Sequence, residues 1–192
     1  GLGDVYKRQG ISSVDEEGAK LNLESEIPDW NFEGVVQQAN VSWNNTLGKI
    51  DIETSDNDSR TVFYTSLYHT FIQPSLASDI DGRYRTMGHE IKRDTSYTNY
   101  TVFSLWDTFR ATHPLYTIIT PKQNQAFIRS LLCKYDESGI LPKWELASNE
   151  TGTMIGYHAV SVIADAIMKK QCDFDIKKAC LLYTSPSPRD AH

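Results

Sequence analysis

The feature that most constrains this fold is a series of helical apolar patterns separated by polar loops. An acidic helical pattern ends at Glu26. Beyond it, apolar residues recur at steps of three and four, the spacing that places them on one helix face. These patterns cover residues 31–47, 61–71, 105–119, 120–139 and 155–170, and a further helix starts near Asp173 or Asp175. Five or six helices in antiparallel order predict helical hairpins rather than alternating strands and helices.

Helix-ending and helix-starting residues support these boundaries. Pro28 ends the acidic helix, Gly48 stands at a C-cap position, and Thr120-Pro121 is typical of a helix start. Pro114 is expected to kink or interrupt the helix over residues 105–119. Residues 10–14 form a β-like piece, residues 49–53 a short strand or extended linker, and residues 75–103 a long loop with short strands.

This pattern predicts a mainly all-α fold, resembling part of an α/α toroid whose site is built from loops at one end. The net charge of −6 over 192 residues argues against nucleic acid as a partner. No apolar stretch approaches the ~18 residues of a membrane span. The three cysteines lack metal-ligand spacing, and nothing in the sequence sets an oligomeric state.

Both ends of the chain fit neither neighbouring helix pattern. Residues 1–9 and 181–192 look like translated adapter tails on an internal fragment of a longer protein, so we exclude both from the fold prediction. The alternative is a natural disordered tail, because Ser-Pro-Ser-Pro has a disordered composition.

A dense polar stretch over residues 141–158, between two helical patterns, is the first candidate site. It contains Trp144, Glu145, Asn149, Glu150 and His158. Glycosidases use two carboxyl groups about 5 to 9.5 Å apart. Glu145 and Glu150 would point about 140° apart on a helix, and to opposite faces of a strand. Only an irregular loop could bring them together, and His158 is expected to be a packed, hydrogen-bonded histidine.

A second polar cluster lies at residues 104–110, where Trp106 is followed by Asp107. The indole offers a flat apolar face and the carboxylate accepts hydrogen bonds from hydroxyls, a combination that suits a sugar ring. The alternative is a capping box, with Ser104 as N-cap and Asp107 at its third position.

The turn at residues 79–85 contains two acids and two arginines. Its glycine is fourth after Asp79, whereas a calcium loop of the EF-hand type needs it sixth, so that match fails. The simpler interpretation is an Asx-type turn, in which Arg83 or Arg85 pairs with Asp79 or Asp81.

Together, residues 64–71, 79–85, 104–110 and 144–158 resemble the catalytic domain of glycoside hydrolase family 92, the calcium-dependent exo-acting α-mannosidases of bacteria. The resemblance covers roughly residues 10–180. It implies an N-terminal β-sandwich followed by an (α/α)6 toroid. Residues 10–30 would then be the last strand of the sandwich and a linker, and residues 31–180 the first part of the toroid.

The resemblance also implies an inverting hydrolase of terminal α-mannosides, often α-1,2-linked, outside the cytoplasm of a bacterium. The family's general acid and base lie in Glu-Gly-Asn-Ala-Trp and Gly-Asn-Asp-Asp motifs that follow this region, and neither motif occurs here. The catalytic residues and most calcium ligands are therefore expected C-terminal to this fragment, which alone would be inactive.

What the resemblance carries over is binding of a mannose-containing glycan. Trp106 and Asp107 match the residues that hold the mannose at the cleavage position, and a second wall of that pocket is matched by Trp144, Glu145, Asn149 and Glu150. Arg83, Arg110 and His158 are weaker assignments, since either arginine could pair with a neighbouring acid. Two alternatives stay open, a non-catalytic carbohydrate-binding toroid and a toroid glycosidase acting on another sugar.

Overall fold

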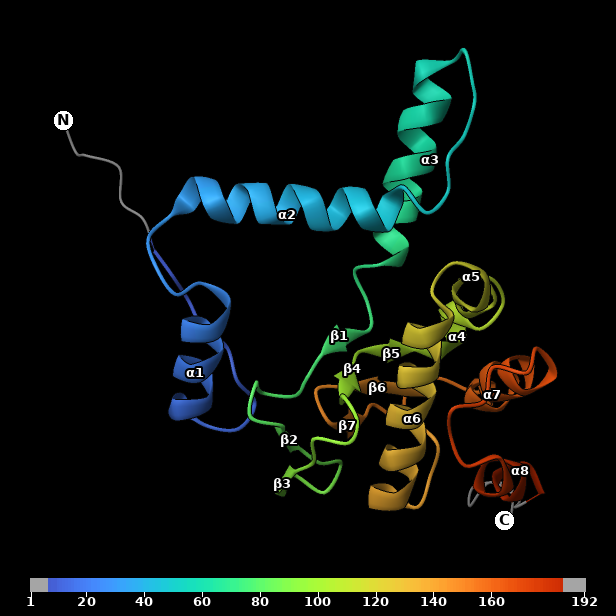
Figure 1. The fold of residues 1–192 in the computed structure, drawn as a ribbon. Coiled ribbons are helices and arrows are strands. Elements are labelled where there is room, and N and C mark those ends of the chain that lie inside the picture. Colours follow the sequence, from blue (N-terminus) through green and yellow to red (C-terminus); the bar gives the residue numbers. More distant parts are fainter. Residues whose placement is uncertain (1–6, 185–192) are drawn as a thin grey trace.

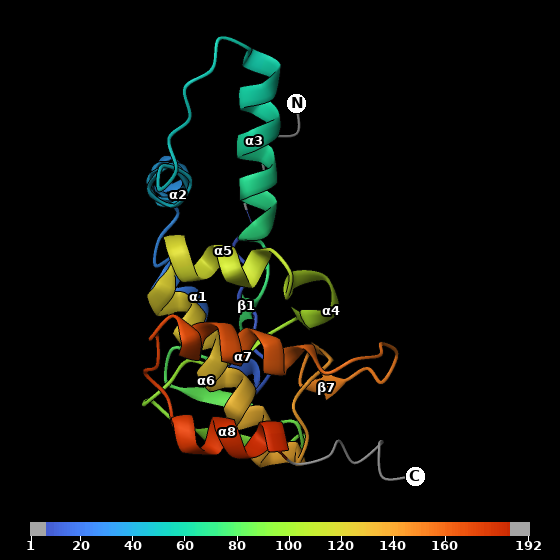
Figure 2. The same cartoon turned by 90° about the vertical axis from the view of Figure 1, so that its right-hand side faces the viewer.

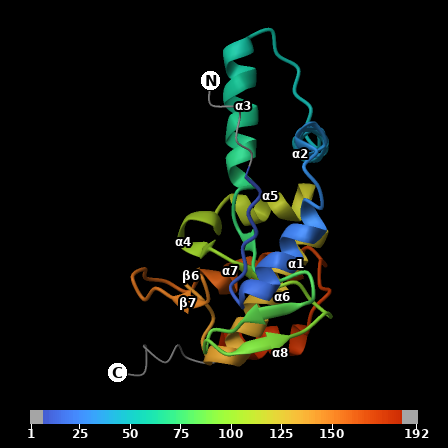
Figure 3. The same cartoon turned by 90° about the vertical axis from the view of Figure 1, so that its left-hand side faces the viewer.

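The computed structural model describes residues 7–184 as a helical body from which a two-helix arm projects (Figure 1). Helix α1 (Glu16–Glu26) lies beside the body, whereas α2 (Phe32–Leu47) and α3 (Asn57–Thr70) form the arm. Figures 2 and 3 show the arm standing clear of the body from two further sides. None of the helices described here is both long and apolar enough to cross a membrane.

The body is built from four helices that pack around one apolar core. They are α5 (Thr112–Ile119), α6 (Pro121–Ser138), α7 (His158–Met168) and α8 (Ile176–Thr184). Helices α6 and α7 each contribute four buried apolar side chains to the core, and the apolar face of α6 meets residues of α5 and α7. The fully buried core side chains include Tyr116, Phe127, Ile128, Leu131, Val162 and Ile163.

Capping residues mark several of the helix boundaries. Asp15 accepts a hydrogen bond from the Gly18 N–H at the start of α1, and Asp56 accepts from Asp58 and Ser59 at the start of α3. Asn31 caps α2 by accepting a hydrogen bond from the Gly34 N–H. Helix α6 starts with Pro121 and ends at Gly139, whose φ of 75° is the left-handed conformation that glycine adopts easily.

The helix expected over residues 105–119, kinked or interrupted by Pro114, is two helices in the structure. Helix α4 (Leu105–Thr108) is one turn long, and α5 begins at Thr112. Pro114 therefore lies in the first turn of α5, where a missing N–H leaves no hydrogen bond unmade. The chain breaks ahead of the proline, not at it.

Within the described residues 7–184, seven short strands form small antiparallel sheets between the helices. Strand β1 (Ser75–Leu76) pairs with β4 (Tyr100–Thr101), and β2 (Arg83–Arg85) pairs with β3 (Ile91–Arg93), so the predicted loop region is ordered. The third sheet has the order β5–β6–β7, from Phe103–Ser104, Trp144–Leu146 and Asn149–Glu150.

Two extended segments expected from the sequence are not strands. Residues 10–14, interpreted as the remnant of a sandwich strand, pair with no strand among residues 7–184. The Ser12 hydroxyl instead accepts from the Val14 N–H and donates to Asp79, a local arrangement that competes with a sheet ladder. Residues 49–53 form a non-strand connection between α2 and α3.

Part of the two expected tails lies outside the described residues, namely residues 1–6 and 185–192. At the C-terminal side, α8 continues to Thr184, so the first residues of the expected tail extend a helix. Whether either tail belongs to the natural protein stays a prediction.

The arm exposes apolar surface that a folded domain normally buries. Helix α2 has no buried residue, and α3 buries Leu67 alone. Exposed apolar side chains on these helices are Val36, Val41, Trp43, Val62 and Tyr68. Trp43 and Tyr68 contact each other, with ring centroids 4.5 Å apart. Isolated helices of this length are marginal in water, so the arm gains little stability from its own contacts.

A protein limited to residues 10–180 is therefore expected to aggregate and to melt without a sharp cooperative transition, because the arm leaves apolar faces open to solvent. Size-exclusion chromatography and differential scanning calorimetry would measure this. A monomeric fragment that melts cooperatively and shows calcium-dependent mannosidase activity would contradict the expectation.

Candidate functional site

The β5–β6–β7 sheet joins the two tryptophan-acid clusters, which are some forty residues apart in sequence. Phe103 pairs with Glu145 and Ser104 pairs with Trp144 across β5 and β6. Because α4 starts immediately after Ser104, Trp106 lies at the end of the sheet where β6 starts, whereas the β6–β7 turn at Ala147 and Ser148 lies at the opposite end. The structure thus brings Trp144 of the second predicted wall next to the segment that carries Trp106 and Asp107, whereas Asn149 lies toward the turn.

Trp106 and Asp107 are both exposed on the one-turn helix α4, with 39% of the Trp106 surface accessible. The Ser104 hydroxyl donates to Asp107 Oδ2 over 2.5 Å. Ser104 makes no side-chain hydrogen bond to a backbone N–H, so the capping-box interpretation is wrong. One oxygen of Asp107 is held in place, and within residues 7–184 the other has no hydrogen-bond partner. An oriented carboxylate beside an exposed indole can bind a hydroxylated ring.

An aromatic cluster supports Trp106 from one side. The His158 ring lies edge-on to Trp106, with centroids 5.3 Å apart, and stacks on Phe109 at 4.1 Å and an interplanar angle of 16°. His158 Nε2 is buried and has no hydrogen-bond partner among the described residues. The expectation of a hydrogen-bonded histidine is therefore wrong for this nitrogen, although the ring is packed as expected.

Glu145 does not line a pocket, contrary to the prediction that it binds substrate. Its side chain is fully buried at 0% exposure. The carboxylate accepts hydrogen bonds from the Thr101 hydroxyl and the Val102 N–H, and from Ser148 N–H at 2.8 Å. Lys134, equally buried, donates to Oε1 at 3.3 Å. These contacts satisfy both carboxylate oxygens, so Glu145 links β6 to β4 and α6. Neither oxygen is left to accept a hydrogen bond from a sugar.

A tight hairpin places Glu145 and Glu150 opposite each other, which the sequence argument did not anticipate. They are paired across β6 and β7, and the turn residues Ala147 and Ser148 both have positive φ, 49° and 64°. Glu150 accepts main-chain hydrogen bonds from Lys143 at 2.7 Å and from Gly152 at 3.0 Å. Both carboxylates are thus occupied in holding the hairpin, and the structure gives no acid/base pair here.

Two further predicted residues lie on the outer part of the hairpin. Trp144 is half-buried in β6, and Asn149 is exposed in β7. Asn149 Oδ1 lies 2.7 Å from His89 Nε2, which comes from the loop between β2 and β3. His89 was not predicted, since it lies sixty residues away with no motif around it.

The two weaker arginine assignments have different outcomes. Arg83 is held by acids, with 2.6 Å contacts to Asp81 and to Asp15, so the alternative of local pairing is correct. The hydrogen bond from the Arg83 guanidinium lowers the pKa of Asp15, and those from its main-chain N–H and guanidinium lower the pKa of Asp81. Arg110 is exposed and lies over the Phe109 ring at 5.2 Å.

The residues present do not form a calcium site by themselves. Among residues 7–184, no group of three His, Cys, Asp or Glu side chains converges on a point where a metal ion could bind. In the acidic turn, Asp79 accepts from Ser12 and Asn22, and Asp81 is paired with Arg83. The hard oxygen ligands that calcium requires are therefore already occupied in this turn.

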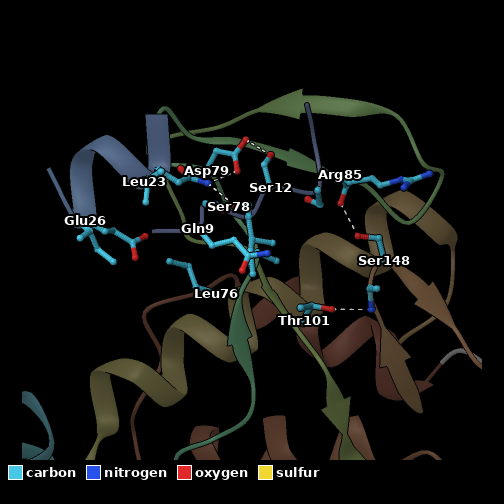
Figure 4. Close-up of a pocket in the computed structure, with 17 residues that line it drawn as sticks. Gln9, Ser12, Leu23, Glu26, Leu76, Ser78, Asp79, Arg85, Thr101 and Ser148 are labelled. Carbon is cyan, nitrogen blue, oxygen red and sulfur yellow. Dashed lines mark hydrogen bonds between the residues drawn. The ribbon is translucent and has the colours of Figure 1, made fainter. Parts of the chain in front are cut away.

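A cavity of about 540 Å³ lies between α1, β1 and the β6–β7 turn (Figure 4). It is lined by residues of the N-terminal segment, by Asp79 and Arg85, and by Thr101 and Ser148. None of the predicted substrate-binding residues lines it. Thr101 and Ser148 also bind Glu145, so this cavity lies behind the hairpin and is separate from Trp106.

Comparison with known proteins identifies the class. The family model described as "Glycosyl hydrolase family 92 catalytic domain" matches residues 18–185. The chain belongs to this family. An uncharacterized secreted glycosidase from the fungus Arthroderma benhamiae is 28% identical over 174 residues, which cover 88% of this chain and 18% of the relative.

Solved structures agree with this assignment. The family GH92 α-mannosidase BT3965 from Bacteroides thetaiotaomicron superposes with a TM-score of 0.86 at 37% identity, over 92% of this chain and 24% of BT3965. The complex of BT3965 with mannoimidazole superposes with a TM-score of 0.85 at 39% identity, over 89% of this chain and 22% of BT3965. The inverting mannosidase BT2199 from the same species superposes with a TM-score of 0.81 at 32% identity, over 89% of this chain and 23% of BT2199.

These matches confirm the family and the fold class, a mainly helical part of an α/α toroid. The chain spans about a quarter of the mannosidases to which it is similar, and less than a fifth of the fungal relative. The described residues therefore provide one part of a larger enzyme fold.

Proposed function

We propose that this chain is part of an inverting α-mannosidase that hydrolyses terminal α-mannosides of glycans, with α-1,2 as the expected linkage. The proposal depends mainly on the exposed pair Trp106 and Asp107, in which Ser104 orients the carboxylate. Support comes from the two mannosidases with the same fold, one of them described as inverting and the other bound to mannoimidazole.

The geometry fits recognition of a pyranose ring. The indole face can stack on the apolar face of the sugar, while the free Asp107 oxygen accepts hydrogen bonds from its hydroxyls. A hydrogen bond to an ionised carboxylate is about twice as strong as one between neutral groups. In this role Asp107 fixes the orientation of the sugar, and Trp106 supplies apolar contact.

The wall formed by the β6–β7 hairpin is proposed to contribute through Trp144 and Asn149, the members of the predicted set with accessible side chains. Arg110 stays a weaker proposal, since it is exposed next to the same helix. Glu145 and Glu150 support this wall from within. The general acid and base are proposed to lie outside this chain, because the described carboxylates of the hairpin are engaged in main-chain hydrogen bonds.

The direct test is a substrate panel on the full-length parent enzyme. We expect the parent to hydrolyse the aryl α-mannoside. Hydrolysis of the aryl glucoside and galactoside is expected to be at least about tenfold slower, because a differently oriented hydroxyl leaves a polar group of the site without its hydrogen bond. Preference for another sugar would favour a different glycosidase. Tight binding of mannose without turnover would favour the non-catalytic carbohydrate-binding toroid.

Calcium is proposed as the cofactor of the parent, bound mainly by residues outside this chain, as the family resemblance implies. Treatment of the parent with a chelator is expected to abolish mannosidase activity, and added calcium to restore it, because a site emptied of its ion loses the charge that organises it. Magnesium, which needs near-ideal octahedral geometry, serves as the control ion. Full activity after exhaustive chelation would contradict this role.

The parent is further proposed to act outside the cytoplasm. The fungal relative is described as secreted, and that description is the support for this location. A bacterial source, periplasmic or at the cell surface, remains part of the proposal.

A further inference from the structure

The aromatic cluster beside Trp106 has a member whose role the sugar-binding proposal leaves open. His158 is the first residue of α7, and its ring contacts two residues of the segment that carries Asp107. It stacks on Phe109 at 4.1 Å and meets Trp106 edge-on at 5.3 Å. The elements α4 and α7 are in contact, and these rings form part of that contact.

The backbone at Gly156 lies close to the imidazole at Nε2. A Cβ atom at position 156 would lie 2.4 Å from His158 Nε2, a distance that no real contact allows. Gly156 also has a φ of 88°, which favours glycine. The ring therefore contacts both the Gly156 backbone, near Nε2, and the stacked ring of Phe109.

The packing of His158 costs folding free energy, so a contribution to stability alone does not explain it. Nε2 is buried without a hydrogen-bond partner among the described residues, and an unpaired buried polar atom costs free energy. Since the same atom is covered by Gly156, it is not available to a sugar hydroxyl in this arrangement. The imidazole ring does make a rigid edge-to-face contact with Trp106.

We propose that His158 is a positioning residue: its ring, packed against Phe109 and the Gly156 backbone, fixes the indole of Trp106 at the angle at which it receives the sugar. This inference rests on the proposed function for its effect on substrate, but not for its effect on Trp106. His158 does not touch the sugar in this scheme. The weaker assignment of His158 to substrate binding is thereby replaced by an indirect role.

The test uses the full-length parent with an aryl α-mannoside as substrate and mannoimidazole as the binding probe. His158→Ala is expected to raise KM and the mannoimidazole Kd by roughly five- to tenfold, the size of one aromatic pair contact, while kcat changes less than about twofold. His158→Phe keeps a ring and is expected to stay within about twofold of wild type. Val160→Ala, a truncation on the same helix that faces the core, is the matched control with unchanged KM.

A double-mutant cycle separates positioning from direct contact. If His158 acts through Trp106, the double variant Trp106→Ala/His158→Ala binds mannoimidazole no more weakly than Trp106→Ala alone. The proposal would be overturned if the effects of the two single variants on mannoimidazole binding multiply in the double variant. It would also be overturned if His158→Phe folds and is as impaired as His158→Ala. Either result would assign Nε2 a direct role.

A readout without sugar keeps the inference testable if the parent is not a mannosidase. In parent enzyme labelled with 5-fluorotryptophan, the ¹⁹F resonance of Trp106 is identified by its loss in Trp106→Phe. His158→Ala is expected to shift or broaden that resonance, and Val160→Ala to leave it unchanged. An unshifted resonance in His158→Ala refutes positioning, whereas absence of mannoimidazole binding by the wild type refutes the proposed function.

Discussion

Asp107→Ala is expected to lower kcat/KM of the full-length parent for an aryl α-mannoside by about 10²–10³-fold, the usual effect of removing a polar group aligned with the reacting sugar. The carboxylate has one oxygen held by Ser104 and one free, so alanine removes both the charge and its orientation. Steady-state kinetics and the Kd for mannoimidazole measure the loss.

Two companion variants isolate the cause. Ser104→Ala leaves the carboxylate but frees its rotation, so a smaller loss of about tenfold is expected, comparable to one lost hydrogen bond. Asp107→Asn keeps the shape and removes the charge, and is expected to resemble alanine more than wild type. An Asp107→Ala enzyme with full activity would remove Asp107 from the site.

The second large effect is on stability and comes from the buried pair of Glu145 and Lys134. Glu145→Ala is expected to destabilise the parent by about 3–5 kcal/mol, because it leaves the Lys134 ammonium buried without its counter-charge. The side chain of Lys134 is 2% exposed, so solvent gives it no substitute partner. Thermal and denaturant unfolding of the domain containing this pair would measure the change.

The partly exposed pair of Asp165 in α7 and Lys169, the residue that follows α7, provides the control. Its side chains are about one-third exposed, and Asp165→Asn is expected to change stability by less than about 1 kcal/mol. A double replacement, Lys134→Met with Glu145→Leu, is expected to recover part of the loss because no unpaired charge remains. Equal effects of Glu145→Ala and Asp165→Asn would mean that Glu145 is not the structural tie that we infer.

The helices were the most predictable part of the fold, for local reasons. Helix α6 has an apolar stripe, Pro121 in its first turn and a glycine at its end, all readable along the chain. The break before α5 was not predictable in the same way. No residue in 109–111 forbids a helix. Pro114 predicted the break at its own position, whereas the structure has it ahead of Thr112.

The candidate site could be proposed from residue types, but its arrangement could not be predicted from the sequence. Trp106 and Asp107 were identified from their chemistry, and both are exposed as a binding pair requires. Glu145 was identified on the same grounds, yet the fold buries it against Lys134. A glutamate next to a tryptophan reads the same in sequence whether its carboxylate faces solvent or the interior.

The sequence by itself therefore determined the helical character of the chain, its main helix boundaries and the tryptophan-acid pair that binds a sugar in our proposal. These depend on periodicity, caps and side-chain chemistry, which act over a few residues. Tertiary structure alone decided that β5 pairs with β6, that Glu145 became structural, and that His158 lies against Trp106. Those outcomes depend on which side chains lose water when distant segments meet, and that burial is set by the whole fold.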